Sequence, residues 1–214
     1  VGLGASGNGN IAAFTANNSG NVPLISTITV VPYFAGCAGV PTIFTITVNP
    51  IPQANTVTGA TYCNGDNTGI TSFAANVPGT LYNWTCSNTS IASLNPSGNP
   101  LPANGTGFIP DLNVFNPGNV PVQANFTITP IANGCTGVAV NYLITVSPDA
   151  IPNPISTIHV CAGDTVHVPA FSANIPGATF SWLNPKPSIG LAASGTGNIP
   201  AFTVSNNFSY PITA

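Results

Sequence analysis

Short stretches in which apolar and polar residues alternate occur along the whole chain. Residues 44–48 (FTITV) place Phe44, Ile46 and Val48 on one face and two threonines on the other. Residues 142–146 (YLITV) repeat the same alternation. Because successive side chains of a β-strand point to opposite faces, this period of two predicts half-buried strands.

Further strands are predicted between these two. Residues 122–129 (VQANFTIT) alternate in the same way, and the turn at 131–137 (IANGCTG) predicts a hairpin that joins them to 142–146. Residues 72–77 (SFAANV) and 170–175 (AFSANI) predict another strand, each followed by Pro-Gly. No segment of ten residues has the spacing of a helix, so the pattern predicts an all-β protein.

A comparison of the chain with itself shows a repeat. Cys63 recurs as Cys161 and Trp84 as Trp182, each 98 residues further on. After the second tryptophan the shift falls to 90, because the middle copy carries about eight extra residues within 87–107. We interpret these extra residues as a loop insertion.

The repeat predicts three parts. Residues 1–49 form the C-terminal half of one repeat, 50–147 a complete repeat, and 148–214 the N-terminal two thirds of a third. Seven or so short strands in about 98 residues, with a tryptophan on the third, are typical of an immunoglobulin-like β-sandwich. We therefore expect tandem Ig-like sandwiches.

The composition excludes several classes of function. Among 214 residues there are one Lys or Arg and four Asp or Glu, with 22 Gly, 22 Pro and no Met. One basic residue cannot neutralise a phosphate backbone, which argues against nucleic-acid binding. No apolar run of 18 residues occurs, so a membrane-spanning segment is not expected. Since 43% of the residues are hydrophobic, the chain can still bury a core.

Candidate chemistry is sparse. His159, Cys161 and His167 could be considered as zinc ligands, but the other copy has threonine and glycine at the two histidine positions. The four aspartates are at least 15 residues apart, and no activated serine motif occurs. We expect no catalytic, metal or cofactor site. Trp84 and Trp182 could stack on sugars, but the third strand favours a place in the core.

Several phrases resemble the PKD-like repeats of giant Bacteroidota surface proteins. They are VPGTLYNWTCSNTSI (77–91), IGLAASGTGNIPAF (189–202), NGCTG (133–137) and FTITVNPIP (44–52). The resemblance implies a β-sandwich spacer in a secreted cell-surface adhesin or filament, of the kind that includes gliding-motility adhesins and type IX secretion cargo. It implies no catalytic residues.

The cysteines follow the repeat. Cys63 and Cys135 belong to the complete copy, and we predict that they form a disulfide, which stabilises small exported domains by about 2–4 kcal/mol. Cys37 and Cys161 would pair with repeats outside this segment or with a neighbouring chain. Cys86 has no counterpart. Buried free thiols throughout are the alternative.

One modification is implied by the resemblance. Residues 164–166 (Asp-Thr-Val) look like the O-glycosylation motif of such proteins, with Thr165 as the acceptor.

The sequence thus predicts a non-catalytic extracellular stalk in adhesion or gliding. Its partners would be neighbouring repeats or identical chains, and surface glycans bound elsewhere. We expect this segment to be a window on a longer array. In the alternative, residues of about 22–48 complete the last repeat of a neighbouring chain as donor strands and pair its Cys161 with Cys37. A carbohydrate-binding module is the remaining alternative.

Overall fold

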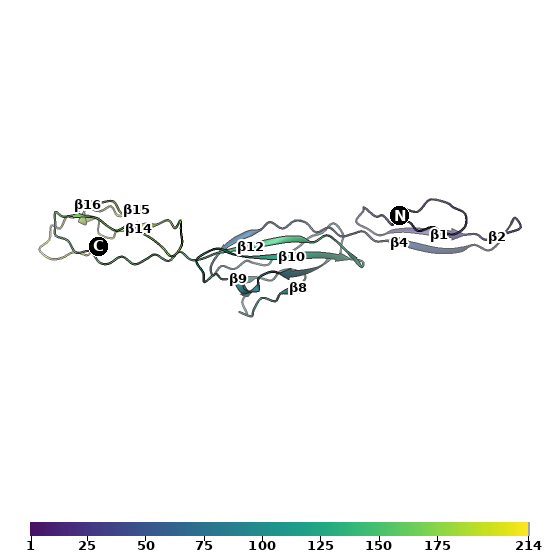
Figure 1. Ribbon diagram of the computed structural model, residues 1–214, viewed down its shortest axis with the longest axis horizontal. Coiled ribbons are helices and arrows are strands. Elements are labelled where there is room, and N and C mark those ends of the chain that lie inside the picture. Colours follow the sequence, from purple (N-terminus) through teal and green to yellow (C-terminus); the bar gives the residue numbers. More distant parts are fainter. Residues whose placement is uncertain (214) are drawn as a thin grey trace. The chain divides into compact units, whose positions relative to one another are not determined.

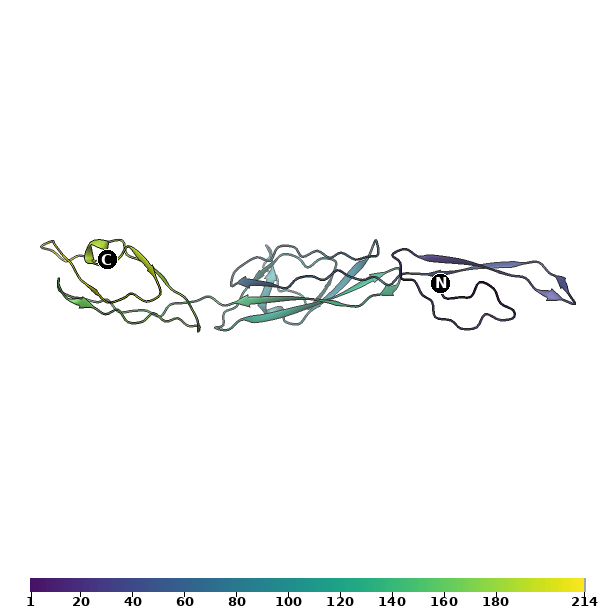
Figure 2. The same ribbon diagram turned by 90° about the horizontal axis from the view of Figure 1, so that it is seen from above.

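The computed structural model describes residues 1–213, and its regular structure is almost entirely β-strand (Figures 1 and 2). The chain divides into two compact units. The first comprises residues 1–116 and 121–147, and the second comprises residues 117–120 and the residues from Pro148 onward. The prediction of an all-β protein is confirmed.

Sixteen strands and two short 3-10 helices make up the regular structure of residues 1–213. In chain order they are β1 (Leu24–Val30), β2 (Tyr33–Phe34), β3 (Cys37–Ala38), β4 (Thr42–Val48), β5 (Ala60–Cys63), β6 (Leu81–Cys86), η1 (Thr89–Ile91), β7 (Ala92–Leu94), β8 (Asn104–Thr106), β9 (Leu112–Val114), β10 (Val122–Ala132), β11 (Cys135–Thr136), β12 (Val140–Ser147), β13 (Thr165–Val166), β14 (Ser181–Leu183), η2 (Pro187–Ile189), β15 (Ser194–Thr196) and β16 (Phe202–Thr203).

The central part of the first unit is a β-sandwich. One sheet has the order β5-β12-β10-β6-β8, and the smaller β7-β9 pair lies on the other side of the core. β5 runs parallel to β12, whereas the other neighbours are antiparallel. The last two long strands of the domain, β10 and β12, lie in the middle of this sheet, next to the tryptophan strand β6. Immunoglobulin-like sandwiches have this arrangement.

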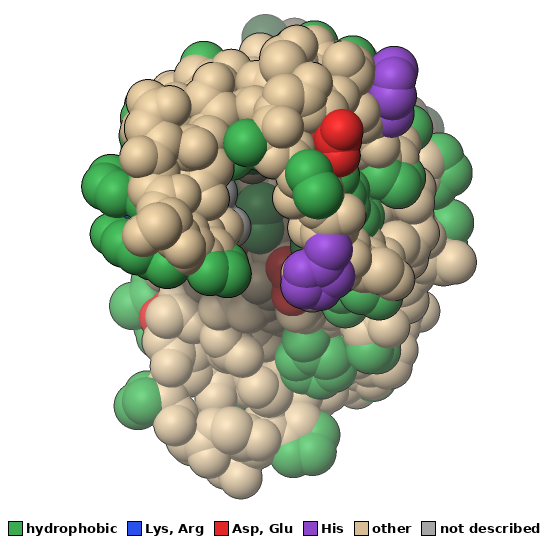
Figure 3. Space-filling model, turned by 90° about the vertical axis from the view of Figure 1, so that its left-hand side faces the viewer, with side chains coloured by type: hydrophobic (Ala, Val, Ile, Leu, Met, Phe, Trp, Pro, Cys, Tyr) green, Lys and Arg blue, Asp and Glu red, His purple; other side chains and the backbone are tan. Residues whose placement is uncertain are grey.

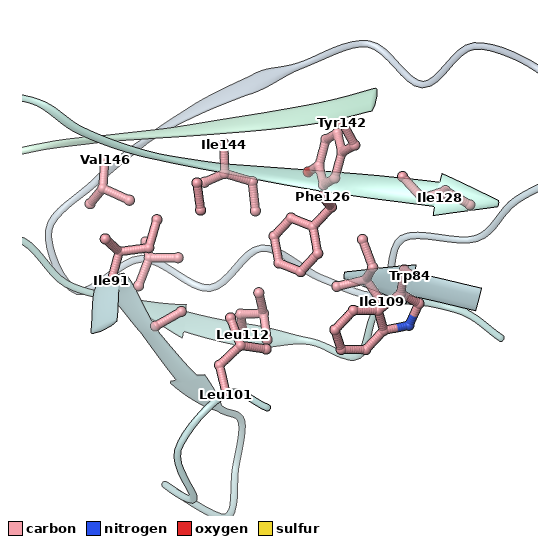
Figure 4. Packing of buried hydrophobic residues seen from close by; sticks show 13 residues of the cluster. Trp84, Ile91, Leu101, Ile109, Leu112, Phe126, Ile128, Tyr142, Ile144 and Val146 are labelled. Atoms are coloured by element: carbon pink, nitrogen blue, oxygen red, sulfur yellow. The ribbon is translucent and has the colours of Figure 1, made fainter. Parts of the chain in front are cut away.

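Aromatic side chains fill the middle of this core. The Phe126 ring lies 5.7 Å from the Trp84 ring and 6.1 Å from the Tyr142 ring, centroid to centroid (Figure 4). Each fully buried side chain of this kind contributes roughly 1.5–3 kcal/mol. The fully buried cluster comprises Trp84, Ile91, Ala92, Leu101, Ile109, Leu112, Val114, Ala124, Phe126, Ile128, Tyr142, Ile144 and Val146.

The predicted hairpin of the central domain is present. β10 and β12 pair from Val122↔Val146 to Ile128↔Val140. At the tip, Asn133 and Gly134 have φ values of 50° and 78°, the left-handed conformation that a tight hairpin turn needs and that Asn-Gly adopts readily.

A second hairpin with the same pairing lies near the N-terminus. β1 and β4 pair from Leu24↔Val48 to Val30↔Thr42, so every pair lies 98 residues before its counterpart in β10 and β12. Its side chains are mostly exposed, in contrast to those of the central hairpin.

The second unit repeats strand pairs of the central sandwich. Trp182 in β14 pairs with Gly195 in β15 as Trp84 in β6 pairs with Gly105 in β8. β13 pairs with β16. Val166 is the one hydrophobic residue of this unit that is fully buried among the described residues.

One strand prediction is wrong. Residues 72–77 and 170–175 form isolated bridges, Ala54↔Ala75 and Pro152↔Ala173, rather than strands. The segments opposite them are rich in proline, which cannot donate to a ladder, so the pairing stops at single bridges. The extra residues of the middle copy lie in the loop between β7 and β8, which brings Leu101 into the core.

Candidate functional site

Three of the four aspartate carboxylates accept hydrogen bonds that support the fold. The Asp66 carboxylate accepts a hydrogen bond from the backbone N–H of Cys63 at 2.8 Å, and Asp164 accepts one from Cys161 at 2.9 Å. Asp111 accepts from the Gly69 N–H at 2.7 Å and from the Asn95 amide at 2.6 Å. The Asp66 and Asp164 bonds span three residues and are the local contacts with which aspartate stabilises turns, whereas Asp111 joins segments that are distant in sequence.

Metal ligands do not gather in the part of the chain that the structure describes. Over residues 1–213, no three His, Cys, Asp or Glu side chains lie close enough to hold an ion. None of the described helices is long and apolar enough to cross a membrane.

The tryptophans pack against glycines on the neighbouring strand. A Cβ added to Gly105 would overlap the Trp84 ring, and one added to Gly195 would overlap the Trp182 ring. Trp84 is 3% exposed, so its indole belongs to the core and cannot stack on a sugar, as the position on the third strand predicted. The buried Nε1 of each indole has no hydrogen-bond partner within the described residues.

An asparagine recurs at the same repeat position in all three copies, and in each copy its side-chain amide donates to a backbone carbonyl. The Asn116 amide, which is 3% exposed, donates to the Val146 carbonyl at 2.9 Å. The Asn18 amide donates to the Val48 carbonyl at 2.8 Å, which is the same contact 98 residues earlier. Asn206 is the third copy, and its amide donates to the Tyr210 carbonyl at 3.0 Å. These residues were not predicted from the sequence, although their repeat spacing was a usable signal.

The structure does not support the predicted disulfide between Cys63 and Cys135. Both residues are free thiols. Cys63 pairs with Ser147 at the end of β12, whereas Cys135 precedes Val140 at its start. Because a strand rises about 3.3 Å per residue, the two lie at opposite ends of the sheet. A disulfide needs Cα atoms within about 7 Å, so the sequence spacing alone was not sufficient to predict one.

The other cysteines are free as well. Cys37 and Cys161 are exposed thiols. Pairing of either with a residue outside this chain stays a prediction, but their repeat positions match Cys135 and Cys63, so the same objection applies to a bond between them within one sandwich. Burial raises the pKa of Cys86, which packs against the core. A partly buried thiol with a raised pKa behaves as a small apolar residue.

The pKa of Tyr62 is strongly shifted. Burial, and then the hydrogen bond with the Tyr142 hydroxyl at 3.4 Å, raise the pKa of Tyr62 to about 12. The neutral phenol is therefore favoured. The nearby Asp111 carboxylate raises this pKa further, so the surroundings of the pair keep the phenol protonated rather than activate it.

Thr165, the predicted glycan acceptor, is exposed in β13, where it pairs with Thr203. Its modification stays a prediction.

Apolar surface is exposed in both units. In the first, the β1-β4 hairpin exposes Leu24, Val30 and Phe44 by 41–42%. In the second, a hollow of about 450 Å³ is lined by residues of 153–158 and 167–172. Figure 3 shows a hollow in this unit with hydrophobic side chains around it. Exposed apolar surface of this kind is a place where another molecule could bind.

A comparison with protein families agrees with a sandwich. Residues 60–150 match the PKD-like domain. This span covers most of the central sandwich, which is called the PKD-like domain below. A search of the curated proteins found no match to the chain.

A solved structure, "Crystal structure of DIP-gamma IG1+IG2", is also similar to this chain. The two share 10% sequence identity, with a TM-score of 0.38. The similarity covers 73% of this chain and 84% of that chain. A likeness this weak says nothing about function.

Proposed function

We propose that this chain is a non-catalytic structural segment of an extracellular adhesin or surface filament. In this function it spaces a binding region away from the cell, and its own surface carries no reaction. The match of residues 60–150 to the PKD-like domain supports a structural or adhesive module.

The observation that carries the proposal is the use of the polar groups in the PKD-like domain. Asp66 and Asp111 each accept a hydrogen bond from a backbone N–H group, those of Cys63 and Gly69, and the Asn116 amide donates to a backbone carbonyl. The large aromatic side chains Trp84, Phe126 and Tyr142 are in the core. The side chains that could do chemistry therefore serve the fold.

The near absence of charge supports a place outside the cell. The formal net charge of 214 residues is −3, and the polar surface is made of amides and hydroxyls. Interactions between charges weaken as salt increases, whereas those between neutral groups change little. A spacer built in this way keeps its contacts when the ionic strength of the surroundings changes.

Surface labelling tests the proposal. An antibody raised against residues 50–147 should stain intact, unpermeabilised cells that express the native protein, and an in-frame deletion of those residues should reduce adhesion without the loss of an enzymatic product. Staining only after permeabilisation would contradict it. Specific binding of the PKD-like domain on a glycan array would favour a carbohydrate-binding module instead.

A further inference from the structure

Residues 49–55 connect the β1-β4 hairpin to the central sandwich, and both belong to the same compact unit. We propose that these residues, called the joint below, are rigid and hold the hairpin in one fixed direction relative to the sandwich. The proposal rests on the proposed spacer function and deepens it, because a spacer keeps its reach only if its joints do not fold.

The sequence of the joint restricts its own backbone. Residues 49–52 read Asn-Pro-Ile-Pro, and they follow β4 directly, since that strand ends at Val48. The proline rings fix φ of Pro50 and Pro52 at about −65°, and each ring disfavours the helical conformation for the residue before it. All four residues are therefore restricted to extended conformations.

Both prolines are buried, and the second lies against the end of the hairpin β10-β12. Pro50, Pro52 and Pro130 are each less than 2% exposed. A Cβ added to Gly137 would overlap the Pro52 carbonyl oxygen and would lie 2.9 Å from the Pro130 ring. The backbone of the joint therefore runs directly against this glycine, in a socket that leaves no room for it to shift.

A side chain fastens the start of the joint to the turn of the same hairpin. The Asn49 amide donates to the Asn133 carbonyl at 2.8 Å. Asn133 is the positive-φ residue at the tip of that turn. Because Asn49 comes directly after the last residue of β4, this hydrogen bond holds the chain at the point where it leaves the β1-β4 hairpin.

Further hydrogen bonds hold the other end of the joint. The Gln53 N–H donates to the Asn76 side-chain oxygen at 2.6 Å, and the Asn76 N–H donates back to the Gln53 carbonyl at 3.1 Å. The Asn55 N–H donates to the Ala74 carbonyl at 2.8 Å. The joint is therefore held at both ends and in the middle.

The hydrogen bonds of this end recur within the second unit. The Ile151 N–H donates to the Asn174 side-chain oxygen at 2.7 Å, and the Asn153 N–H donates to the Ser172 carbonyl at 2.8 Å. These residues follow β12 as the joint follows β4. Two segments of different sequence are thus fixed by the same contacts, which indicates that the contacts are a feature of the fold.

The joint differs from a flexible linker in what it does to the reach of the chain. A linker rich in glycine and serine is a random coil that lets its two ends approach each other, whereas a proline-rich extended segment keeps a length of about 3.1 Å per residue. With a rigid joint, the length of the β1-β4 hairpin is added to that of the sandwich. The spacer then projects and does not fold back on itself.

Distances between two spin labels across the joint test the proposal. The labels are attached to Thr45→Cys in β4 and Asn83→Cys in β6, two exposed positions, with the native cysteines replaced by alanine. A reference pair, Asn83→Cys and Thr145→Cys, lies within the central sandwich. Double electron–electron resonance gives the distribution of each distance. We expect the distribution across the joint to be nearly as narrow as that of the reference pair.

A variant of the prolines should release the joint. Pro50→Gly combined with Pro52→Gly should widen the distribution across the joint by about twofold or more, because both the backbone restriction and the buried rings are lost. The reference pair should keep its width, which shows that the sandwich stays folded. The matched control is Ile51→Ala, between the two prolines. The Ile51 side chain is 58% exposed, so neither distribution should change.

A second variant acts on the socket and leaves the sequence of the joint intact. Gly137→Ala places a Cβ against the Pro52 carbonyl oxygen, so it should displace the joint and widen the distribution across it. Thr136→Ala, at the exposed position beside it, is the control and should have no effect.

A wild-type distribution across the joint as broad as that of the double glycine variant would overturn the proposal. So would controls that widen the distribution as much as the test variants do. Either result leaves the proposed spacer function intact, because staining of intact cells and adhesion test that function without reference to stiffness.

Discussion

The β10-β12 and β1-β4 hairpins have the same strand pairing and opposite environments. In the first, Phe126 and Tyr142 are at most 3% exposed, whereas Phe44 in the second is 42% exposed. Pairing in these hairpins is therefore set locally, by alternation and a tight turn. Stability depends on the sheet that covers the apolar face, since an isolated two-stranded hairpin is marginal in water.

The largest effect expected from this difference is on core aromatics. Tyr142→Ala should destabilise β10-β12 by about 3–5 kcal/mol, as core aromatic truncations do, whereas Phe44→Ala should change β1-β4 by less than about 1 kcal/mol. Hydrogen exchange with peptic peptides, at concentrations where the chain is monomeric, measures both hairpins in one experiment. Equal losses would show that β1-β4 is covered.

The tryptophan-glycine contacts allow the packing of the two units to be compared. Gly105→Ala would push a Cβ into the Trp84 ring and should cost about 1–3 kcal/mol, a typical penalty for overpacking. Gly195→Ala makes the same overlap with Trp182 in a unit with a smaller core, so we expect a smaller loss.

Urea denaturation followed by the fluorescence of each tryptophan, with the other changed to phenylalanine, measures these losses. Gly7→Ala is the control, because no atom lies within 4 Å of its added Cβ. A larger loss for Gly195→Ala would contradict the view that the second unit is the less packed.

Elements that depend on local pattern were predictable from the sequence. Alternation at 142–146 and the Asn133-Gly134 turn were sufficient for the hairpin. The strand at 72–77 failed because alternation does not reveal whether the opposite segment can donate hydrogen bonds.

The disulfide failed for a related reason. Repeat spacing identifies equivalent cysteines but does not say at which end of a sheet Cys63 and Cys135 lie. The Asn116 contact was predictable in principle, since the asparagine recurs in all three copies.

The asparagine contacts give a third test of the two hairpins. Asn116→Ala leaves the buried Val146 carbonyl without its 2.9 Å donor and should cost about 1–3 kcal/mol. Asn18→Ala removes the same bond at Val48 in a more exposed place, where water can replace it, so we expect less than about 1 kcal/mol. Hydrogen exchange at the ends of β12 and β4 compares them, and equal effects would contradict the difference in burial.

The smallest expected effect is a loss of stability at alkaline pH. It should appear in the PKD-like domain alone, because the Tyr62-Tyr142 pair lies there. The pKa of Tyr62 is raised to about 12 in the folded chain, from about 10 when unfolded. Between these values the unfolded state loses the phenolic proton and the folded state keeps it, so stability falls as pH rises. Below pH 10 the contribution is complete. Thermal unfolding between about pH 9 and 12 should show this decline, and Tyr62→Phe should flatten it. An unchanged slope in that variant would mean that another group titrates.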